Sequence, residues 1–235
     1  LIGQLPQGVT GKDIIITLCG LFNNDEVLNH VLEFTGDGVQ LLSIDERLSI
    51  ANMTTEWGAL AGVFPIDNTT IDWLENRAEF IANRGLEGVP SDSDGINNQH
   101  PRINIENINK LKKQPFKADE DAFYTNSITL NLHSVSPHIS GPNHVKSMTS
   151  IQDATEKQIK INKAYLVSCV NSRVEDLAEA AKIIRDKKVA SHVEFYIAAA
   201  SSEVQDESKN RGDWQTLIKS GAIPLPPGCG PCIGL

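Results

Sequence analysis

The sequence has little of what a membrane protein or a nucleic-acid-binding protein requires. None of its apolar runs approaches the roughly 20 residues that a helix needs to cross a bilayer, and its first residues show neither a signal peptide nor an Arg-rich transit sequence. Lys and Arg form no cluster, and the 21 basic residues are outnumbered by 30 acidic ones, so that the net charge is −9. This charge disfavours contact with phosphate backbones, and we expect neither a membrane nor a nucleic acid as partner.

Two further features are missing. An extended glycine fingerprint for phosphate binding is absent, because the apolar run 31–35 is followed only by Gly36-Asp37-Gly38, which is typical of a tight turn from a strand into a helix. An initiator Met is absent as well, and the chain stops just past a cysteine motif, so we expect a piece of a longer protein. Its 235 residues, 40% of them apolar, suffice for one large or two ordinary domains.

Cysteines are few, but three of the four stand in two short segments. Cys229 and Cys232 form a Cys-x-x-Cys pair, whose intervening Gly and Pro allow a tight backbone that presents both sulfurs to one centre. Cys169 follows the strand-like segment 164–168, and the carboxyl ends of strands are where the sites of α/β proteins gather. Three thiolates favour an iron–sulfur cluster with one open iron, whereas a tetrahedral zinc ion wants a fourth Cys or His.

Alternating strand and helix signals predict an α/β fold with mostly parallel sheets flanked by helices. Capping boxes mark three predicted helix starts, at Thr10 with Asp13, Ser43 with Glu46, and Ser172 with Glu175. Helices are predicted over 10–22, 44–61, 70–83, 173–185 and 204–220, and strands over 31–35, 127–132, 164–168 and 193–200. Cys19 lies inside the first helix without a Cys or His nearby, and we interpret it as a buried apolar side chain.

The segments around the cysteines resemble those of a known family. Ser168-Cys-Val-Asn-Ser-Arg-Val-Glu-Asp-Leu177 and Gly228-Cys-Gly-Pro-Cys-Ile-Gly234 closely resemble the cluster-binding segments of the aconitase family of hydro-lyases. The resemblance implies that Cys169, Cys229 and Cys232 hold three corners of a [4Fe-4S] cluster, whose fourth iron binds hydroxyl and carboxylate oxygens of the substrate. Val170 stands where the family usually has Thr, so a hydroxyl beside the ligand is missing.

Asn52 and Glu56 lie four residues apart on the predicted helix 44–61 and so share one face. From spacing alone, this is an ordinary solvated face. The surrounding run, from Glu33 to Ala59, is also similar to the aconitase family, and this resemblance implies that both side chains face the active site. There the carboxylate pairs with a His of a preceding domain, outside this chain. Proton abstraction next to a carboxylate and expulsion of hydroxide need such acid–base groups near a Lewis-acidic metal.

The resemblance also implies a division of the chain. Residues 1–142 are similar to the family's second α/β domain with a polar insertion at about 85–121, 143–162 read as a linker, and 163–235 are similar to part of the third α/β domain, which carries the cluster cysteines. On this view the chain is a fragment of a larger multidomain enzyme, and its partners are the flanking domains of the same polypeptide and a small tricarboxylic acid substrate.

The segment from Glu56 to Asp67 is most similar to the homoaconitase branch of the family, ahead of mitochondrial aconitase and isopropylmalate isomerase. The resemblance implies dehydration and rehydration of homocitrate to homoisocitrate in lysine biosynthesis, in the mitochondrial matrix. Two readings from other classes stay open, a non-catalytic metal-stabilised module and an RNA-binding protein of the kind some relatives become without their cluster. The acidic charge disfavours the second of these.

Overall fold

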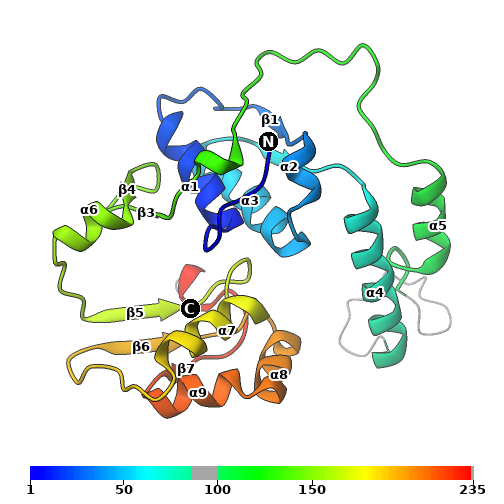
Figure 1. The fold of residues 1–235 in the computed structure, drawn as a ribbon. Helices are drawn as coiled ribbons and strands as arrows, with labels where there is room; N and C mark the ends of the chain where they lie inside the picture. The colour runs from blue at the N-terminus through cyan, green and yellow to red at the C-terminus, as the bar shows by residue number, and fades with distance from the viewer. Residues whose placement is uncertain (86–99, 234–235) are drawn as a thin grey trace. The chain divides into compact units, whose positions relative to one another are not determined.

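The computed structural model describes residues 1–85 and 100–233. The chain divides into two compact units, Leu1–Met148 and Thr149–Leu235, each of which combines helices with short parallel strands (Figure 1). The predicted mixed α/β class is therefore confirmed. Among the helices of the described residues, none has the length and the apolar composition that a membrane span requires.

Unit 1 is built around the helices α1 and α3, which pack against each other. Its elements are α1 (Gly11–Leu21), β1 (Val31–Glu33), α2 (Asp37–Gln40), α3 (Ile44–Trp57), β2 (Ala61–Val63), α4 (Asn68–Arg84), α5 (Ile105–Lys113), the 3-10 helix η1 (Leu132–Ser134) and β3 (His138–Ser140). Strands β1 and β2 are parallel, with Val31 opposite Ala61. The core between the two helices contains Ile14, Ile15, Ile50 and Trp57, all almost fully buried. Burial of such apolar side chains is the main stabilising term of this unit.

Two of the predicted capping boxes form as expected. The Asp13 carboxylate accepts a hydrogen bond from the backbone N–H of Thr10 at 2.9 Å, and the Glu46 carboxylate accepts one from the N–H of Ser43 at 2.9 Å. The Ser43 hydroxyl in turn accepts from the N–H of Glu46 at 3.2 Å. These bonds satisfy backbone donors that the first turn of a helix leaves unpaired, and they fix where α1 and α3 begin.

The helix predicted over 44–61 ends earlier, at Trp57. Gly58 adopts a φ of 107°, a left-handed conformation that terminates the helix, and the chain then turns into β2. The strand was missed because its pairing partner, β1, is distant in sequence. Gly62 lies where an added Cβ would come within 2.9 Å of Thr54 and 3.0 Å of the Ala51 backbone, so that only glycine lets β2 approach α3.

The strand predicted over 127–132 is also wrong. Within the described residues this segment makes a single parallel bridge, between Ile2 and Asn131, and then enters η1. The backbone of Ile2 bonds both Leu130 and Leu132, at 3.0 and 2.8 Å. A lone bridge to one short segment cannot propagate into a ladder, although the alternating apolar side chains are typical of a strand.

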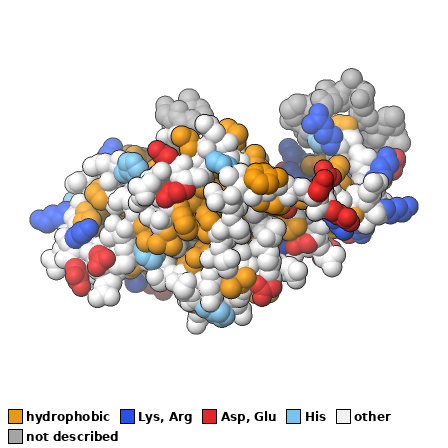
Figure 2. Space-filling view, turned by 90° about the horizontal axis from the view of Figure 1, so that it is seen from above, with side chains coloured by type: hydrophobic (Ala, Val, Ile, Leu, Met, Phe, Trp, Pro, Cys, Tyr) orange, Lys and Arg blue, Asp and Glu red, His pale blue; other side chains and the backbone are white. Residues whose placement is uncertain are grey.

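The described part of the polar stretch predicted as an insertion, 85–121, contains a helix that was not predicted from the sequence. Helix α5 begins after Asn104, whose side chain accepts from the N–H of Asn107 at 2.9 Å, and its Ile108 is buried against Ile71 and Ala78 of α4. Positions 86–99 of the predicted insertion lie outside the described residues. Acidic and basic side chains are intermixed over the α4–α5 pair (Figure 2), and they include the Lys112–Glu75 ion pair at 2.6 Å.

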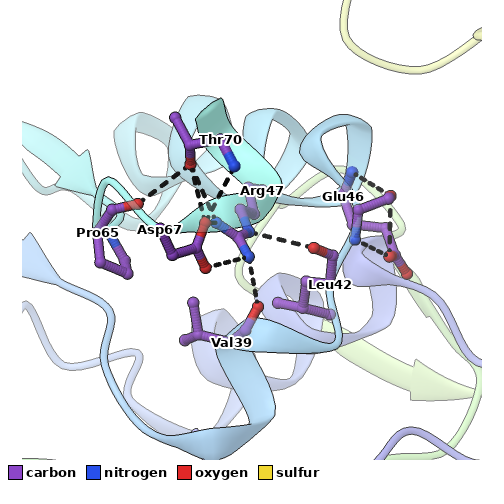
Figure 3. A network of polar contacts seen from close by, with 8 residues as sticks. Val39, Leu42, Glu46, Arg47, Pro65, Asp67 and Thr70 are labelled. Carbon is purple, nitrogen blue, oxygen red and sulfur yellow. Dashed lines mark hydrogen bonds and ion pairs between the residues drawn. The ribbon is translucent and has the colours of Figure 1, made fainter. Parts of the chain in front are cut away.

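Arg47 joins three segments of unit 1 from within α3 (Figure 3). Its guanidinium forms a bidentate pair with Asp67, both contacts at 2.8 Å, and donates to the carbonyls of Leu42 at 3.2 Å and Val39 at 2.9 Å. Arg47 is only 3% exposed. Burial opposes ionisation of Asp67, but the bonds from Arg47 and from the N–H of Thr70 outweigh it and hold the pKa of Asp67 below its ordinary value.

We expect Asp67→Asn to lower the free energy of unfolding of this chain by about 3 kcal/mol, the lower end for a broken buried pair because Asp67 is partly exposed. Asn still caps α4, so the change isolates the lost charge. Because the pKa of Asp67 is depressed by folding, its contribution is complete above the unfolded value of 3.8 and disappears as the pH falls through the folded value.

Urea unfolding between pH 7 and pH 2 measures this effect. The matched control is Glu106→Gln, which breaks the solvent-exposed pair with Lys110 in the same unit and is expected to leave the free energy of unfolding nearly unchanged. Equal losses in the two variants would contradict the anchoring role of Arg47 and Asp67.

Unit 2 contains a three-stranded parallel sheet in the order β5-β6-β7. Its elements are α6 (Ile151–Glu156), β5 (Lys163–Leu166), α7 (Val174–Ile184), β6 (Glu194–Ile197), α8 (Ser202–Arg211), α9 (Asp213–Ser220), β7 (Ile223–Pro224) and η2 (Gly230–Ile233), and the short strand β4 (Met148–Ser150) begins at the last residue of unit 1. The three helices α7, α8 and α9 pack together over Leu166 and Ile197. Tyr165 directly precedes Leu166 in β5, and Tyr196 directly precedes Ile197 in β6. The two tyrosine rings stack on each other and are partly exposed.

Candidate functional site

Cys169 lies in the turn that follows β5, where the sequence placed it. The residue before it, Ser168, has a φ of 114°, which is unusual for a residue other than glycine. The Ser168 hydroxyl accepts from the backbone N–H of Val170 at 3.2 Å and of Asn171 at 3.4 Å. These bonds tighten the turn, and the Cys169 side chain is exposed to solvent.

The capping box predicted for the next helix is wrong by one residue. Helix α7 begins after Arg173, whose backbone N–H donates to the carboxylate of Asp176 at 3.0 Å. Ser172 is fully buried instead, with a φ of 63°, and its hydroxyl donates to the carbonyl of Leu166 at 3.2 Å. A Ser three residues before Glu175 looked like a cap, but Ser172 ties the turn back to the end of β5.

Cys229 and Cys232 lie on the segment that follows β7. The backbone N–H of Cys232 donates to the carbonyl of Cys229 at 3.1 Å, which closes the tight turn expected of the Cys-x-x-Cys pair. Cys229 Sγ lies 3.5 Å from Cys169 Sγ. This contact and the charge of Cys169, together with slight desolvation and Cys232, raise the pKa of Cys229.

The last residue of β6 and the three alanines after it, residues 197–200, hold both cysteine segments. On one side, the N–H groups of Ala198 and Ala200 donate to the carbonyls of Leu166 and Ser172, each at 3.0 Å. On the other side, the carbonyls of Ile197 and Ala199 accept from Leu225 at 2.8 Å and Gly228 at 2.9 Å. We call 197–200 the alanine rail. Its four residues are buried, and the small side chains of its three alanines let both segments lie against one backbone.

The chemistry of the three thiols fits an iron–sulfur cluster. All three are free, Cys169 and Cys232 are exposed, and soft thiolates are the ligands that such clusters take. Within residues 1–85 and 100–233, no three His, Cys, Asp or Glu side chains are already gathered as ligands of one ion. Of the three cysteines, Cys169 and Cys229 are in contact through their sulfurs.

Asn52 and Glu56 both lie on the exposed side of α3 in unit 1, and Arg47 on the same helix anchors it. Cys19, predicted to be buried, is 1% exposed. Burial, and to a smaller extent the negative charge of Glu56, raises the pKa of Cys19 to about 11. Cys19 is therefore a protonated core side chain, separate from the other three thiols.

Sequence reasoning missed three supporting features, namely the anchoring role of Arg47, the turn made by Ser168 and the alanine rail. An Arg inside an otherwise apolar helix face was the available signal for Arg47, because a buried guanidinium requires a partner. The run Ala198-Ala-Ala200 at a strand end was the signal for the rail, but its hydrogen bonds join segments far apart in the chain.

The architecture is that of an α/β protein with a thiol site at the carboxyl edge of a parallel sheet. The model of the aconitase family (aconitate hydratase) matches residues 1–235. The mitochondrial homoaconitases of Debaryomyces hansenii, Mycosarcoma maydis and Yarrowia lipolytica are 54%, 54% and 55% identical to the chain over 235, 236 and 235 residues. Each alignment covers 100% of this chain and 32% of the relative.

The chain therefore belongs to the aconitase family, whose enzymes are hydro-lyases that usually bind an iron–sulfur cluster. It spans about a third of the length of the curated relatives that it matches.

Proposed function

We propose that the chain is the cluster-binding part of a mitochondrial hydro-lyase of the homoaconitase type. Such an enzyme interconverts homocitrate and homoisocitrate through homoaconitate. The observation that carries the proposal is the contact between Cys169 and Cys229 on neighbouring loops, within a chain that is more than half identical to three homoaconitases along its whole length.

Cys169, Cys229 and Cys232 would hold the [4Fe-4S] cluster. When bound, the cluster supplies Lewis acidity toward a hydroxyl and a carboxylate of the substrate. The chain's own acid–base group is Glu56, a carboxylate that takes or gives a proton, and Asn52 one turn earlier offers a hydrogen bond on the same face. Both act on a small tricarboxylic acid.

The two main parts of the chain, residues 1–142 and 163–235, correspond to successive domains of the larger enzyme. Residues 1–142 with the insertion 85–121 form part of the second domain, 143–162 the connection, and 163–235 part of the third. The relatives are about three times as long as this chain, which supports further domains of the same polypeptide as its principal partners. The names of the relatives support the mitochondrion as its compartment.

The substrate is tested with the full-length enzyme. Its kcat/KM for hydration of homoaconitate should exceed that for cis-aconitate by roughly 10-fold or more, since one methylene in a fitted pocket contributes that scale of discrimination. Isopropylmaleate serves as the third substrate. A preference for cis-aconitate or isopropylmaleate would assign the enzyme to another branch of the family and overturn the proposed substrate.

Replacing Glu56 by Gln in the full-length enzyme is expected to lower kcat by roughly 100-fold or more while the visible spectrum of the cluster stays unchanged. Gln keeps the size of the side chain but cannot exchange a proton. Thr55→Val, at an exposed neighbouring position of α3, is the matched control and should leave kcat within about 2-fold. A normal rate in Glu56→Gln would return Glu56 to the role of a solvated surface residue.

A further inference from the structure

A serine with a left-handed backbone conformation stands at each end of the turn that carries Cys169. Ser168 has a φ of 114° and Ser172 a φ of 63°. Non-glycine residues adopt such values at a cost and keep them only where surrounding contacts impose them. Two of them four residues apart, one on each side of a cysteine, indicate that the turn is built for a defined position of that side chain.

Each serine makes hydrogen bonds that stabilise its unusual backbone conformation. The Ser168 hydroxyl accepts from the N–H groups of Val170 and Asn171, which folds the turn over Cys169. The Ser172 hydroxyl donates to the carbonyl of Leu166, and the Ser172 carbonyl accepts from the N–H of Ala200. The turn is thereby tied both to β5 and to the alanine rail.

The same rail positions the opposite thiol. Gly228, next to Cys229, donates to the carbonyl of Ala199, one residue before the Ala200 that bonds Ser172. The two cysteine segments are therefore fixed to neighbouring peptide groups of one buried backbone, and this arrangement brings Cys169 Sγ and Cys229 Sγ to 3.5 Å from each other.

We propose that Ser168 and Ser172 are positioning residues that preform the Cys169 turn opposite Cys229. The inference rests on the proposed function, in which these two cysteines are cluster ligands. Residues that orient metal ligands typically change metal affinity by 10- to 100-fold when they are replaced. Neither serine touches the substrate or the cluster in this role, and both act through Cys169.

The first test uses the full-length enzyme with its cluster reconstituted, and follows iron release to a chelator by absorbance. Ser168→Ala and Ser172→Ala should release iron about 10-fold faster than the wild type. Ser168→Asn should restore most of the retention, because Asn tolerates a positive φ and its side-chain oxygen accepts from the same two N–H groups. The matched control is Ser201→Ala in the same unit, which removes a serine hydroxyl that accepts from the N–H of Val204 and caps α8.

The second test needs no cluster. In metal-free protein carrying Cys232→Ser, the oxidant diamide takes two electrons and two protons from Cys169 and Cys229 and leaves a disulfide, which peptide mass spectrometry detects. Ser168→Ala and Ser172→Ala should form this disulfide about 5-fold more slowly, the equivalent of one lost hydrogen bond in the positioning of the thiols. Ser201→Ala should form it at the wild-type rate.

The outcomes separate the inference from the proposed function. Failure of the wild type to bind iron would refute the proposed function, whereas the disulfide rates would still decide the role of the two serines. Iron release and disulfide formation that match Ser201→Ala in both serine variants would overturn the inference. If Ser172→Ala fails to fold, as its burial allows, Ser168→Ala with its Asn rescue decides the question, since Ser168 is only partly buried.

Discussion

Full-length protein carrying Cys169→Ser, Cys229→Ser or Cys232→Ser should lose most of its iron and sulfide after anaerobic reconstitution. In the proposed site, each of the three thiolates would hold one iron of the cluster, and a serine hydroxyl is a hard and far less acidic replacement for a soft thiolate. The expected loss is therefore nearly complete in each variant. Hydration of homoaconitate should fall with it, because Lewis acidity toward the substrate disappears.

Cys19→Ala is the control in the same experiment. Its side chain is buried in unit 1 and protonated, so its replacement should cost some stability through a small cavity but no iron. An equal loss of iron from all four variants would mean either that the ligands are assigned wrongly or that the substitutions disturb the fold in general. A normal iron content in any one of the three ligand variants would remove that cysteine from the set.

The second large effect concerns the chain alone. Even with a cluster installed, these 235 residues are expected to show no measurable conversion of homocitrate or homoaconitate. The reaction also needs a base at the α-carbon, cations that clamp the substrate carboxylates and an acid for the leaving hydroxyl. Within this chain, only Glu56 and Asn52 have a motif-based claim to that surface. Groups that act as one unit are strongly non-additive, so the loss of several leaves little beyond background.

An ultraviolet assay of the unsaturated intermediate measures this, with the full-length enzyme as the positive control. The resemblance to the family implies a His partner for Glu56 outside this chain, so we expect the chain alone also to lack the neighbour that would set the protonation state of Glu56. Substantial turnover by the chain that disappears in Cys232→Ser would contradict this prediction and would place the missing catalytic groups within these residues.

Local signals sufficed for much of the fold. Helices α1 and α4 and the start of α3 follow from apolar spacing and from capping side chains such as Asp13 and Glu46, whose hydrogen bonds join residues three apart. The strands β5 and β6 follow from short apolar runs between turns. In each case the stabilising contacts that the pattern reports are close in sequence, so one stretch contains the information.

The failures lie where distant segments decide the structure. Strand β2 exists because it pairs with β1, whereas among the described residues 127–132 pairs only with Ile2 and does not become a strand. Helix α5 is polar except for a narrow stripe around Ile108, and its burial against α4 was not visible from composition. Pairing and packing of this kind depend on tertiary contacts that local propensity does not report.

The candidate site divides in the same way. A Cys-x-x-Cys motif and a cysteine after a buried strand can be recognised locally, and so can the spacing of Asn52 and Glu56. The backbone hydrogen bonds of the alanine rail join Ala198 to Leu166 and Leu225 to Ile197, residues 28 or more positions apart, and no local pattern predicts them. The role of Ser172 was misread for the same reason, since its partner is Leu166 rather than the N-terminus of the next helix.

Metal analysis of the anaerobically reconstituted full-length protein, combined with its visible absorption, bears most directly on a cluster held by Cys169, Cys229 and Cys232. We expect iron and acid-labile sulfide in equal amounts and the broad brown absorption of an iron–sulfur protein, all lost in Cys169→Ser. A colourless protein that binds zinc through the same cysteines, or one that takes up no metal at all, would contradict the account and favour a non-catalytic module.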